Sequence, residues 1–353
     1  MRTKEREHPA RQSRVRGVGA TGRPVTLSDL AREARTSPST ASRALRGQGY
    51  VSGEVRTRLL AAAERLGYVP NASAQNLKHR TSKIIGVVVS DLSNQFYARV
   101  AAGIEAELRC SGYQMMLVGD HNDDTEELAA ARSFLALRSP GVIITPIRPT
   151  VSELLAARGV AVVEVDRQLS PRSCDAVVLD NVTGAFAATS HLLSLGHRRV
   201  AFIGVETSWT SDAGRRLGYQ QAHERANLPS DPALSLLVPQ GPGSHEAVIA
   251  EFLARTQPTA LFIGNNALAD HTWRVLRDRG DRLPADISLV AFDDLPWMDM
   301  VTPTITVVAQ PTEELGRRAA QLCLERIADP TLPRRVVEIA PNLLLRGSTA
   351  PVA

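Results

Sequence analysis

The stretch VTLSDLAREARTSPSTASRALRG, residues 25–47, has the pattern of two short helices joined by a tight turn. Thr26 and Asp29 have the spacing of a capping box at the start of the first helix. Ser37 is a good N-cap for the second helix, and Pro38 suits its first position. Because only a few residues separate the two helices, the stretch predicts a helix-turn-helix.

The second helix carries little apolar surface. Its apolar residues fall on one face at a 3.6-residue period, namely Ala41, Ala44 and Leu45. The opposite face carries small hydroxyls and arginines, namely Ser39, Ser42, Arg43 and Arg46. Two interpretations fit this pattern: a solvated surface helix, or a helix that lies against phosphates and base edges. The neighbouring sequence decides between them.

A third helix is predicted from about Val55 to Leu66, after Ser52. Gly67 and Pro70 follow it, and both residue types stop helices. The residues before the first helix are rich in Arg, Gly and Ser and show no periodicity, which predicts a disordered basic tail. The three helices together predict a small N-terminal domain.

From Lys83 onward, apolar runs alternate with helical patterns. The runs include IIGVVVSD, GVIITPI, VAVVEVD and SLVAFDD. Apolar strands that alternate with helices predict an α/β fold whose parallel sheets are covered by helices on both faces. About 265 residues of this pattern exceed one doubly wound domain, so the sequence predicts two similar lobes.

Charge is distributed unevenly along the 353 residues. The first 80 hold sixteen Lys and Arg against six Asp and Glu, whereas the rest hold twenty-five against thirty-one. A basic small domain joined to an acidic large one predicts that only the first part binds an anionic partner.

Other bulk features predict a cytoplasmic protein. No apolar run approaches the roughly 20 residues of a membrane span. The charged N-terminal stretch lacks the apolar core of a secretory signal. Three widely spaced cysteines predict reduced thiols, with neither a disulfide framework nor a metal site.

Polar residues close several of the predicted strands, namely Asp91, Asp166, Asn265, Asp293 and Asp294. In open α/β sheets, ligands bind outside the carboxyl ends of the strands. Asp and Asn are also common wherever strands turn, so each residue singly is equally consistent with a turn. Several of them together predict a ligand cleft, and their chemistry suits a hydroxyl-rich ligand.

The order of these parts resembles the LacI/GalR (lactose-repressor) family of bacterial transcription regulators. The resemblance covers about residues 24–347 and rests on VTLSDLAREARTSPSTASRALRG, VSGEVRTRLLAAAERLGYVPNASAQNL, IIGVVVSDLSNQFYARVAAGIE, LGHRRVAFIG and LPADISLVAFDDLPWMDMVTPTITVVAQP. It implies a three-helix helix-turn-helix domain followed by a two-lobed, doubly wound effector domain like that of periplasmic binding proteins. It also implies a ligand-responsive regulator that binds double-stranded operator DNA as a homodimer, with no enzymatic activity, cofactor, metal or membrane partner.

The resemblance also implies domain boundaries. We expect a disordered basic tail over 1–23, the helix-turn-helix domain over 24–70, a hinge helix and linker over 71–82, the two-lobed effector-binding and dimerisation domain over 83–347, and a C-terminal tail over 348–353.

Matched residue by residue, the family's DNA contacts fall on the basic domain and the segment after it. Base-reading positions are implied for Pro38, Ser39 and Arg43, with Arg46 beside them. Arginine suits guanine through a bidentate contact. Phosphate contacts are implied for Thr26, Ser37, Thr40 and Ser52. Within the hinge segment, Leu77 matches a leucine that wedges into the minor groove, with Asn71 and Ala74 as its neighbours.

The resemblance also implies a set of effector-binding residues, namely Asn94, Phe96, Asp166, Arg215, Asn265, Asp293 and Gln310. Trp209 is either a surface that stacks on a sugar or an exposed loop residue. The expected effector is a sugar or sugar derivative that releases a repressor of carbohydrate uptake or catabolism genes. The alternative is a corepressor-dependent regulator whose ligand is a nucleobase or another small metabolite.

The residues are also compared with two other classes of protein, an enzyme and a transport-type binding protein. In a glycoside-acting enzyme, Asp166 and Asp293 would pair as acid and base. A transport-type binding protein would need export. The acidic stretch DHNDDTEE, residues 120–127, resembles the opening of a calcium loop but lacks its glycine and closing glutamate, which predicts a solvated loop.

Two residues depart from the family's pattern. Arg35 stands where the family usually has glycine, in the turn between the first two helices. If that turn needs a positive φ, arginine costs about 1 kcal/mol relative to glycine. Asn266 replaces the usual aspartate, which bears on the identity of the effector.

Overall fold

The structure is a computed structural model that describes residues 25–46, 49–68, 82–241 and 245–352. It divides into two compact units, residues 1–80 and 81–353. The predicted basic tail and most of the predicted hinge segment, with Asn71, Ala74 and Leu77, lie outside the described residues. Within them, no helix is both long and apolar enough to cross a bilayer.

The described part of the N-terminal unit consists of three helices, α1 (Leu27–Glu33), α2 (Pro38–Arg46) and α3 (Gly53–Leu66). Their apolar edges meet in one buried cluster, formed by Leu30, Ala31, Ala34, Ala41, Ala44, Leu59 and Ala62. Alanines make up most of this cluster, so the helices pack closely although few large side chains are present. The predicted small helical domain is confirmed.

Local signals fix the ends of these helices. Thr26 and Asp29 form the predicted capping box at α1. The Ser37 hydroxyl accepts the backbone N–H of Thr40 at 3.1 Å, which caps α2. Arg35 has a φ of 51°, so an arginine occupies a backbone conformation that favours glycine.

The second unit contains two six-stranded sheets, ordered β11-β5-β4-β3-β1-β2 in lobe 1 and β12-β10-β9-β8-β6-β7 in lobe 2. Lobe 1 has β1 (Ile84–Val89), β2 (Gln114–Gly119), β3 (Gly141–Ile144), β4 (Ala161–Val165), β5 (Asp175–Leu179) and β11 (Val336–Ile339). Lobe 2 has β6 (Val200–Glu206), β7 (Ser235–Pro239), β8 (Ala260–Ile263), β9 (Ser288–Phe292), β10 (Thr306–Ala309) and β12 (Asn342–Leu344). All described strand pairs are parallel except β10 with β12.

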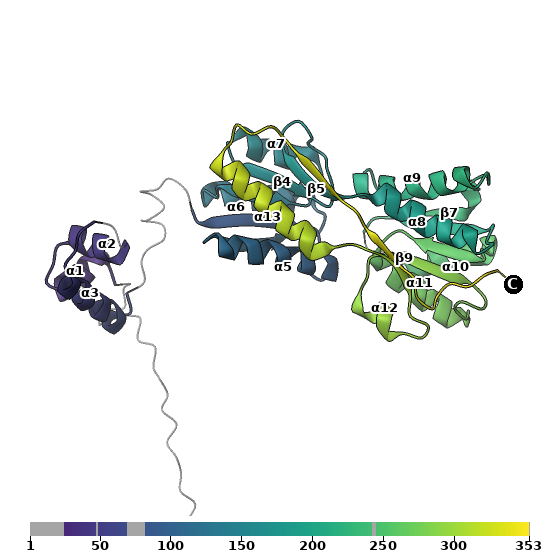
Figure 1. Ribbon diagram of the computed structural model, residues 1–353, viewed down its shortest axis with the longest axis horizontal. Helices are drawn as coiled ribbons and strands as arrows, with labels where there is room; N and C mark the ends of the chain where they lie inside the picture. Colours follow the sequence, from purple (N-terminus) through teal and green to yellow (C-terminus); the bar gives the residue numbers. More distant parts are fainter. Residues whose placement is uncertain (1–24, 47–48, 69–81, 242–244, 353) are drawn as a thin grey trace, which may run out of the picture. The chain divides into compact units, whose positions relative to one another are not determined.

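Helices cover both faces of each sheet (Figure 1). In lobe 1, α5 (Gln95–Cys110) and α13 (Thr312–Ala328) pack on one face, and α6 (Asp124–Ala136) and α7 (Pro149–Ala157) on the other. In lobe 2, α8 (Asn181–Ser194) and α9 (Thr210–Arg225) pack opposite α10 (His245–Thr256), α11 (Asn266–Arg279) and α12 (Pro296–Met300). The predicted pair of doubly wound lobes is confirmed.

The sequence pattern missed three strands, β7, β11 and β12. Each of them lies at the edge of its sheet. Edge strands are covered on fewer sides, and β11 and β12 accordingly alternate between exposed and half-buried residues. Their apolar runs are short, so they do not stand out from the loops around them.

The chain passes between the lobes three times: after β5, after β10, and between β11 and β12. The expected C-terminal tail from residue 348 needs correction, because these residues pack against lobe 2. Ser348 is fully buried and its hydroxyl accepts the backbone N–H of Thr306 at 2.8 Å. The Ala350 carbonyl lies 3.0 Å from Nε2 of His197.

Helices α5 and α13 cross at two glycines. A Cβ on Gly316 would overlap the backbone carbonyl of Val100, and one on Gly103 would overlap that of Glu313. Both helices also bury apolar faces against the same side of the lobe 1 sheet. Close backbone contact therefore holds α13, which follows a crossing between the lobes, against α5.

Replacing Gly316 with alanine should lower the free energy of unfolding by about 1–3 kcal/mol, because the added methyl forces α5 and α13 apart. Urea unfolding followed by circular dichroism measures the change. Gly53→Ala is the control, since Gly53 also lies in a helix but has no atom within 4 Å of an added Cβ. Equal stability of the two variants would contradict the prediction.

Candidate ligand cleft and nucleic-acid interface

A cleft between the two lobes is lined by side chains from both of them. The residues predicted to bind an effector all line it, namely Asn94, Phe96, Asp166, Arg215, Asn265, Asp293 and Gln310. They come from strand ends and from the helices that follow them, as expected for parallel sheets. Their shared position is an observation, whereas their role in binding stays a prediction.

Asp166 and Asp293 occupy equivalent places in the two lobes. They directly follow β4 and β9, each of which is the third strand from its edge in the same sheet order. Both have positive φ, 69° and 74°, and their residues are only 7% and 6% exposed. The internal symmetry of the fold thus places one buried carboxyl group at the base of the cleft in each lobe.

Burial raises the pKa of both carboxyl groups. Nearby guanidinium groups oppose this rise, chiefly that of Arg167 for Asp166 and that of Arg215 for Asp293. Asp293 also accepts hydrogen bonds from the backbone N–H of Asn266 at 3.1 Å and from Nε2 of Gln310 at 2.5 Å. Hydrogen-bond donors therefore engage the carboxyl group of Asp293, whereas that of Asp166 faces the Arg167 guanidinium at 3.6 Å.

Arg215 is held rigidly by lobe 2. Its Nε donates to Oδ1 of Asn181 at 2.8 Å, and its Nη1 donates to the Gly264 carbonyl at 2.7 Å. The guanidinium carbon lies 4.0 Å from the centre of the Phe292 ring. Because Asn181 begins α8 and Phe292 ends β9, Arg215 links two elements beside the cleft.

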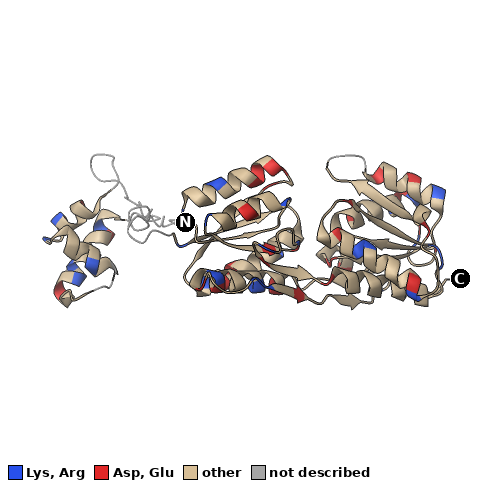
Figure 2. Ribbon diagram, turned by 90° about the horizontal axis from the view of Figure 1, so that it is seen from above, with Lys and Arg blue, Asp and Glu red and all other residues tan. Residues whose placement is uncertain are grey.

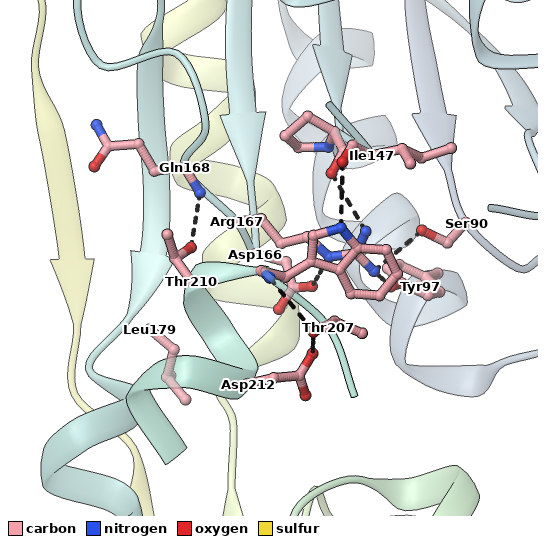
Figure 3. Close-up of polar contacts among 12 residues, drawn as sticks. Ser90, Tyr97, Ile147, Asp166, Arg167, Gln168, Leu179, Thr207, Thr210 and Asp212 are labelled. Atoms are coloured by element: carbon pink, nitrogen blue, oxygen red, sulfur yellow. Dashed lines mark hydrogen bonds and ion pairs between the residues drawn. The ribbon is translucent and has the colours of Figure 1, made fainter. Parts of the chain in front are cut away.

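Arg167 is a cleft residue that the sequence reasoning missed. Its Nη2 donates to the Tyr97 hydroxyl at 3.1 Å and to Oγ of Ser90 at 3.3 Å, and its Nη1 donates to the Pro146 carbonyl (Figure 3). The sequence could have indicated Arg167 through its position directly after Asp166. A backbone turn that places one side chain in the cleft also brings the next side chain close to the cleft.

Trp209 lies against Arg167, with the guanidinium carbon 3.3 Å from the ring centre. Its indole N–H donates to the Ile147 carbonyl at 3.3 Å. The ring is half-buried and lines the cleft, so the interpretation of Trp209 as an exposed loop residue is wrong. Stacking of this ring on a sugar stays a prediction.

Hydrogen bonds join the lobes at both edges of the cleft. At one edge, Nδ2 of Asn94 donates to Oδ1 of Asn266 at 3.2 Å, and Nδ2 of Asn266 donates back to Oδ1 of Asn94 at 3.0 Å. At the other edge, the Trp209 bond to Ile147 is joined by the Gln168 N–H, which donates to Oγ1 of Thr210 at 3.1 Å. The cleft is thus closed by bonds within the protein.

The acidic stretch 120–127 is solvated as predicted over residues 121–126, but its two ends are buried and α6 begins within it. Asp123 caps α6, while Asp120 and Glu127 are buried. Glu127 accepts the backbone N–H of Ile147 at 2.9 Å, and burial raises its pKa to about 7. The Glu127 carboxyl group therefore holds Ile147 in place, and the carbonyl of Ile147 accepts the hydrogen bond from the Trp209 indole. Among the described residues, no group of three or more His, Cys, Asp or Glu is arranged to hold a metal ion.

The outer face of α2 is polar and accessible. Pro38, Ser39 and Arg43 are exposed, whereas the side chain of Arg46 lies outside the described residues. The hydroxyls of Ser39 and Thr40 lie 2.8 and 2.9 Å from that of Ser37. Figure 2 shows that basic residues outnumber acidic ones on the helices of this unit.

The other predicted phosphate contacts also lie at helix starts. Thr26 is exposed and shared with the capping box of α1. Ser52 stands at the N-cap of α3 but makes no side-chain capping hydrogen bond, which leaves its hydroxyl for another partner. Helix N-termini favour phosphate groups because unpaired N–H groups point outward there.

Comparisons with known proteins define the class. Residues 26–71 match the family described as bacterial regulatory proteins, lacI family, and residues 189–349 match a periplasmic binding protein-like domain. The regulator PtxS of Pseudomonas putida is 33% identical, over 93% of this chain and 96% of that protein. The fold and these matches define a DNA-binding transcription regulator with a two-lobed ligand domain.

Solved structures agree with this class. The lac repressor dimer bound to operator and the anti-inducer ONPF is 25% identical, covers 93% of this chain and 100% of its own, and has a TM-score of 0.82. The CelR–cellobiose complex is 28% identical, with a TM-score of 0.69 and coverage of 92% and 100%. This chain belongs to the lacI family of bacterial regulatory proteins. The interpretation as a glycoside-acting enzyme is therefore wrong.

Replacing Asn266 with alanine should open the cleft, because both bonds to Asn94 are lost while Asn94 still caps α5. We expect a larger radius of gyration by small-angle X-ray scattering and a loss of about 1–2 kcal/mol in the free energy of unfolding. Ser93→Ala is the control, since the Ser93 hydroxyl bonds only within lobe 1, to Asp91. An unchanged radius of gyration in Asn266→Ala would argue against this bridge.

Proposed function

We propose that this chain represses carbohydrate uptake or catabolism genes by binding an operator as a homodimer, and that a sugar or sugar derivative in the cleft releases the operator. The proposal places its action in the bacterial cytoplasm, on nucleoid DNA. The DNA-binding part of the proposal follows from the family. The type of ligand follows from the carboxylate and amide groups that line this cleft.

The observation that carries the proposal is the cleft that both lobes line and close. A ligand inside it contacts side chains of lobe 1 and lobe 2 together, so its binding favours one relative arrangement of the lobes. Carboxylate and amide groups at strand ends suit a ligand with several hydroxyls. The structure of CelR, a relative at 28% identity, was solved as a cellobiose complex, which supports a sugar-type ligand here.

For the operator, the proposal assigns base reading to α2. In a dimer, two such helices enter successive major grooves of a near-palindromic site. The exposed outer face of α2 supports Pro38, Ser39 and Arg43 as base-reading residues, with Arg46 alongside. Phosphate contacts are proposed for Thr26, Ser37, Thr40 and Ser52. The resemblance supports Leu77 as a minor-groove wedge flanked by Asn71 and Ala74.

Pro38 has no side-chain donor, so specificity on α2 falls mainly on Arg43. Arg43→Ala should relax base preference at one position in each half-site by about 1–3 kcal/mol. Selection of binding sites from random duplexes, using the full chain, measures the preference. Arg32→Ala removes the same charge from an exposed site on α1 and should leave the base preference unchanged. The same preference in Arg43→Ala as in the unmodified protein would exclude this reading role.

The proposed function is tested by asking whether a sugar releases the protein from the operator that the selection of binding sites identifies. We expect at least one sugar of a broad panel to bind in a thermal-shift screen and to weaken operator binding in a fluorescence-anisotropy titration. Arg215→Ala should lose both responses, because it removes a guanidinium group that lines the cleft and links α8 to β9. Operator binding should be retained, because Arg215 lies outside the N-terminal unit. A ligand that strengthens operator binding would instead support the corepressor alternative, and cleavage of a glycoside would contradict the proposal.

A further inference from the structure

Negative charge predominates in the cleft. Four carboxylates line it, namely Asp91, Asp166, Asp212 and Asp293, against the two guanidinium groups of Arg167 and Arg215. His245 and His271 also line it, but Nδ1 of His271 lies 2.7 Å from a carboxylate oxygen of Glu246. Any positive charge on that imidazole is therefore already matched by a neighbouring carboxylate.

Neither arginine presents an open fork to an anion. A carboxylate or phosphate binds arginine best through two parallel bonds from adjacent nitrogens. In Arg215, Nε and one N–H of Nη1 already bond within the protein, so Nη2 is the only nitrogen of this group without a hydrogen-bond partner among the described residues. In Arg167, Nη1 and Nη2 are engaged, and only Nε lacks a hydrogen-bond partner among the described residues. That Nε faces Oδ2 of Asp166 at 3.6 Å.

An aromatic ring covers one face of each guanidinium group as well. Trp209 lies over Arg167, and Phe292 lies against Arg215. Both arginines are almost fully buried, at 3% and 5% exposure, so a ligand cannot draw them out without breaking these contacts. They act as fixed parts of the cleft wall and partly balance its carboxylates.

Two acceptors of the cleft, in contrast, lack hydrogen-bond donors from the described residues. A carboxylate can only accept hydrogen bonds. Among the described residues, no hydrogen-bond donor lies closer to the carboxyl group of Asp166 than the Arg167 contact at 3.6 Å. Oε1 of Gln310 is buried without a partner among the described residues. Hydroxyl and ammonium groups of a ligand supply the missing donors, whereas a ligand carboxylate supplies only further acceptors and a repelling charge.

We infer that the cleft selects polyhydroxylated ligands that are uncharged or carry an amino group, and that it excludes their carboxylate and phosphate derivatives. The inference rests on the proposed function, since it specifies which sugar-type ligands act as the effector. It follows from the fixed geometry of both arginines together with the excess of carboxylates.

Matched ligand series test the inference on the full chain. Each series holds a neutral sugar, its amino derivative, its uronic acid and its phosphate, built on glucose, galactose and mannose, with ribose and ribose 5-phosphate added. Affinities are measured by isothermal titration calorimetry at pH 7.5. We expect a neutral or amino member to bind, and its acid and phosphate to bind at least about tenfold more weakly.

The outcomes separate this inference from the function on which it rests. An acid or phosphate that binds as tightly as its neutral partner overturns the inference and leaves the sugar-responsive function in place. Failure of every member to bind, in protein that still binds its operator, overturns the sugar-type effector and this inference with it.

Charge variants sharpen the test. Asp212→Asn removes one carboxylate from the cleft and keeps an acceptor oxygen for the Thr207 hydroxyl, which lies 2.6 Å from Asp212. It should narrow the affinity ratio between a neutral sugar and its acid. Asp278→Asn makes the same change at an exposed site outside the cleft and should leave the ratio unchanged. Asp91→Asn is a second cleft variant. An unchanged ratio in both cleft variants overturns the inference.

Discussion

The cost of burying two carboxyl groups governs the architecture of the cleft. Asp166 and Asp293 lie at equivalent strand ends, and an unpaired buried charge is expensive. Each carboxyl group is accordingly placed near a guanidinium group, that of Arg167 for Asp166 and that of Arg215 for Asp293. For Asp293, one donor is the backbone of α11 and the other is Gln310, which lies where the chain passes from β10 toward α13. The hydrogen bond from Gln310 to Asp293 therefore holds the segment between β10 and α13, where the chain crosses between the lobes, at the base of the cleft.

The same contacts extend from the base of the cleft into lobe 1. Asn266 binds Asp293 through its backbone and Asn94 through its side chain, and Asn94 caps α5. Helix α5 in turn meets α13 through backbone contact at Gly103 and Gly316. Tightly packed helices transmit a displacement because they have no space in which to absorb it. A ligand that alters the donors around Asp293 thus acts on elements of both lobes.

The sequence predicted the features that follow from the period of apolar residues and from the position of polar residues at strand ends. Apolar runs located the central strands, and their polar ends marked Asp166, Asn265 and Asp293, because parallel strands bring these ends together. The prediction failed where contacts between residues far apart in the sequence determine whether a segment is a strand or a side chain is buried. The edge strands β7, β11 and β12 have only short apolar runs. Glu127 looks solvated in the sequence, but the folded chain buries it against the segment after β3, where it accepts the N–H of Ile147. Arg167 carries no pattern of its own, since its role depends on Tyr97, Ser90 and Trp209 meeting around it.

Asn266 shows how a departure from the family pattern acquires a physical meaning. An aspartate at this position could accept a bond from Nδ2 of Asn94 but could not donate to its Oδ1, so the reciprocal bridge would lose one of its two bonds. It would also add a carboxylate next to Asp293, in a cleft that already holds four. The amide closes the edge of the cleft with no added charge. The excess of negative charge therefore remains at the base and walls of the cleft, where a ligand's donors meet it, while closure of the lobes depends on neutral groups.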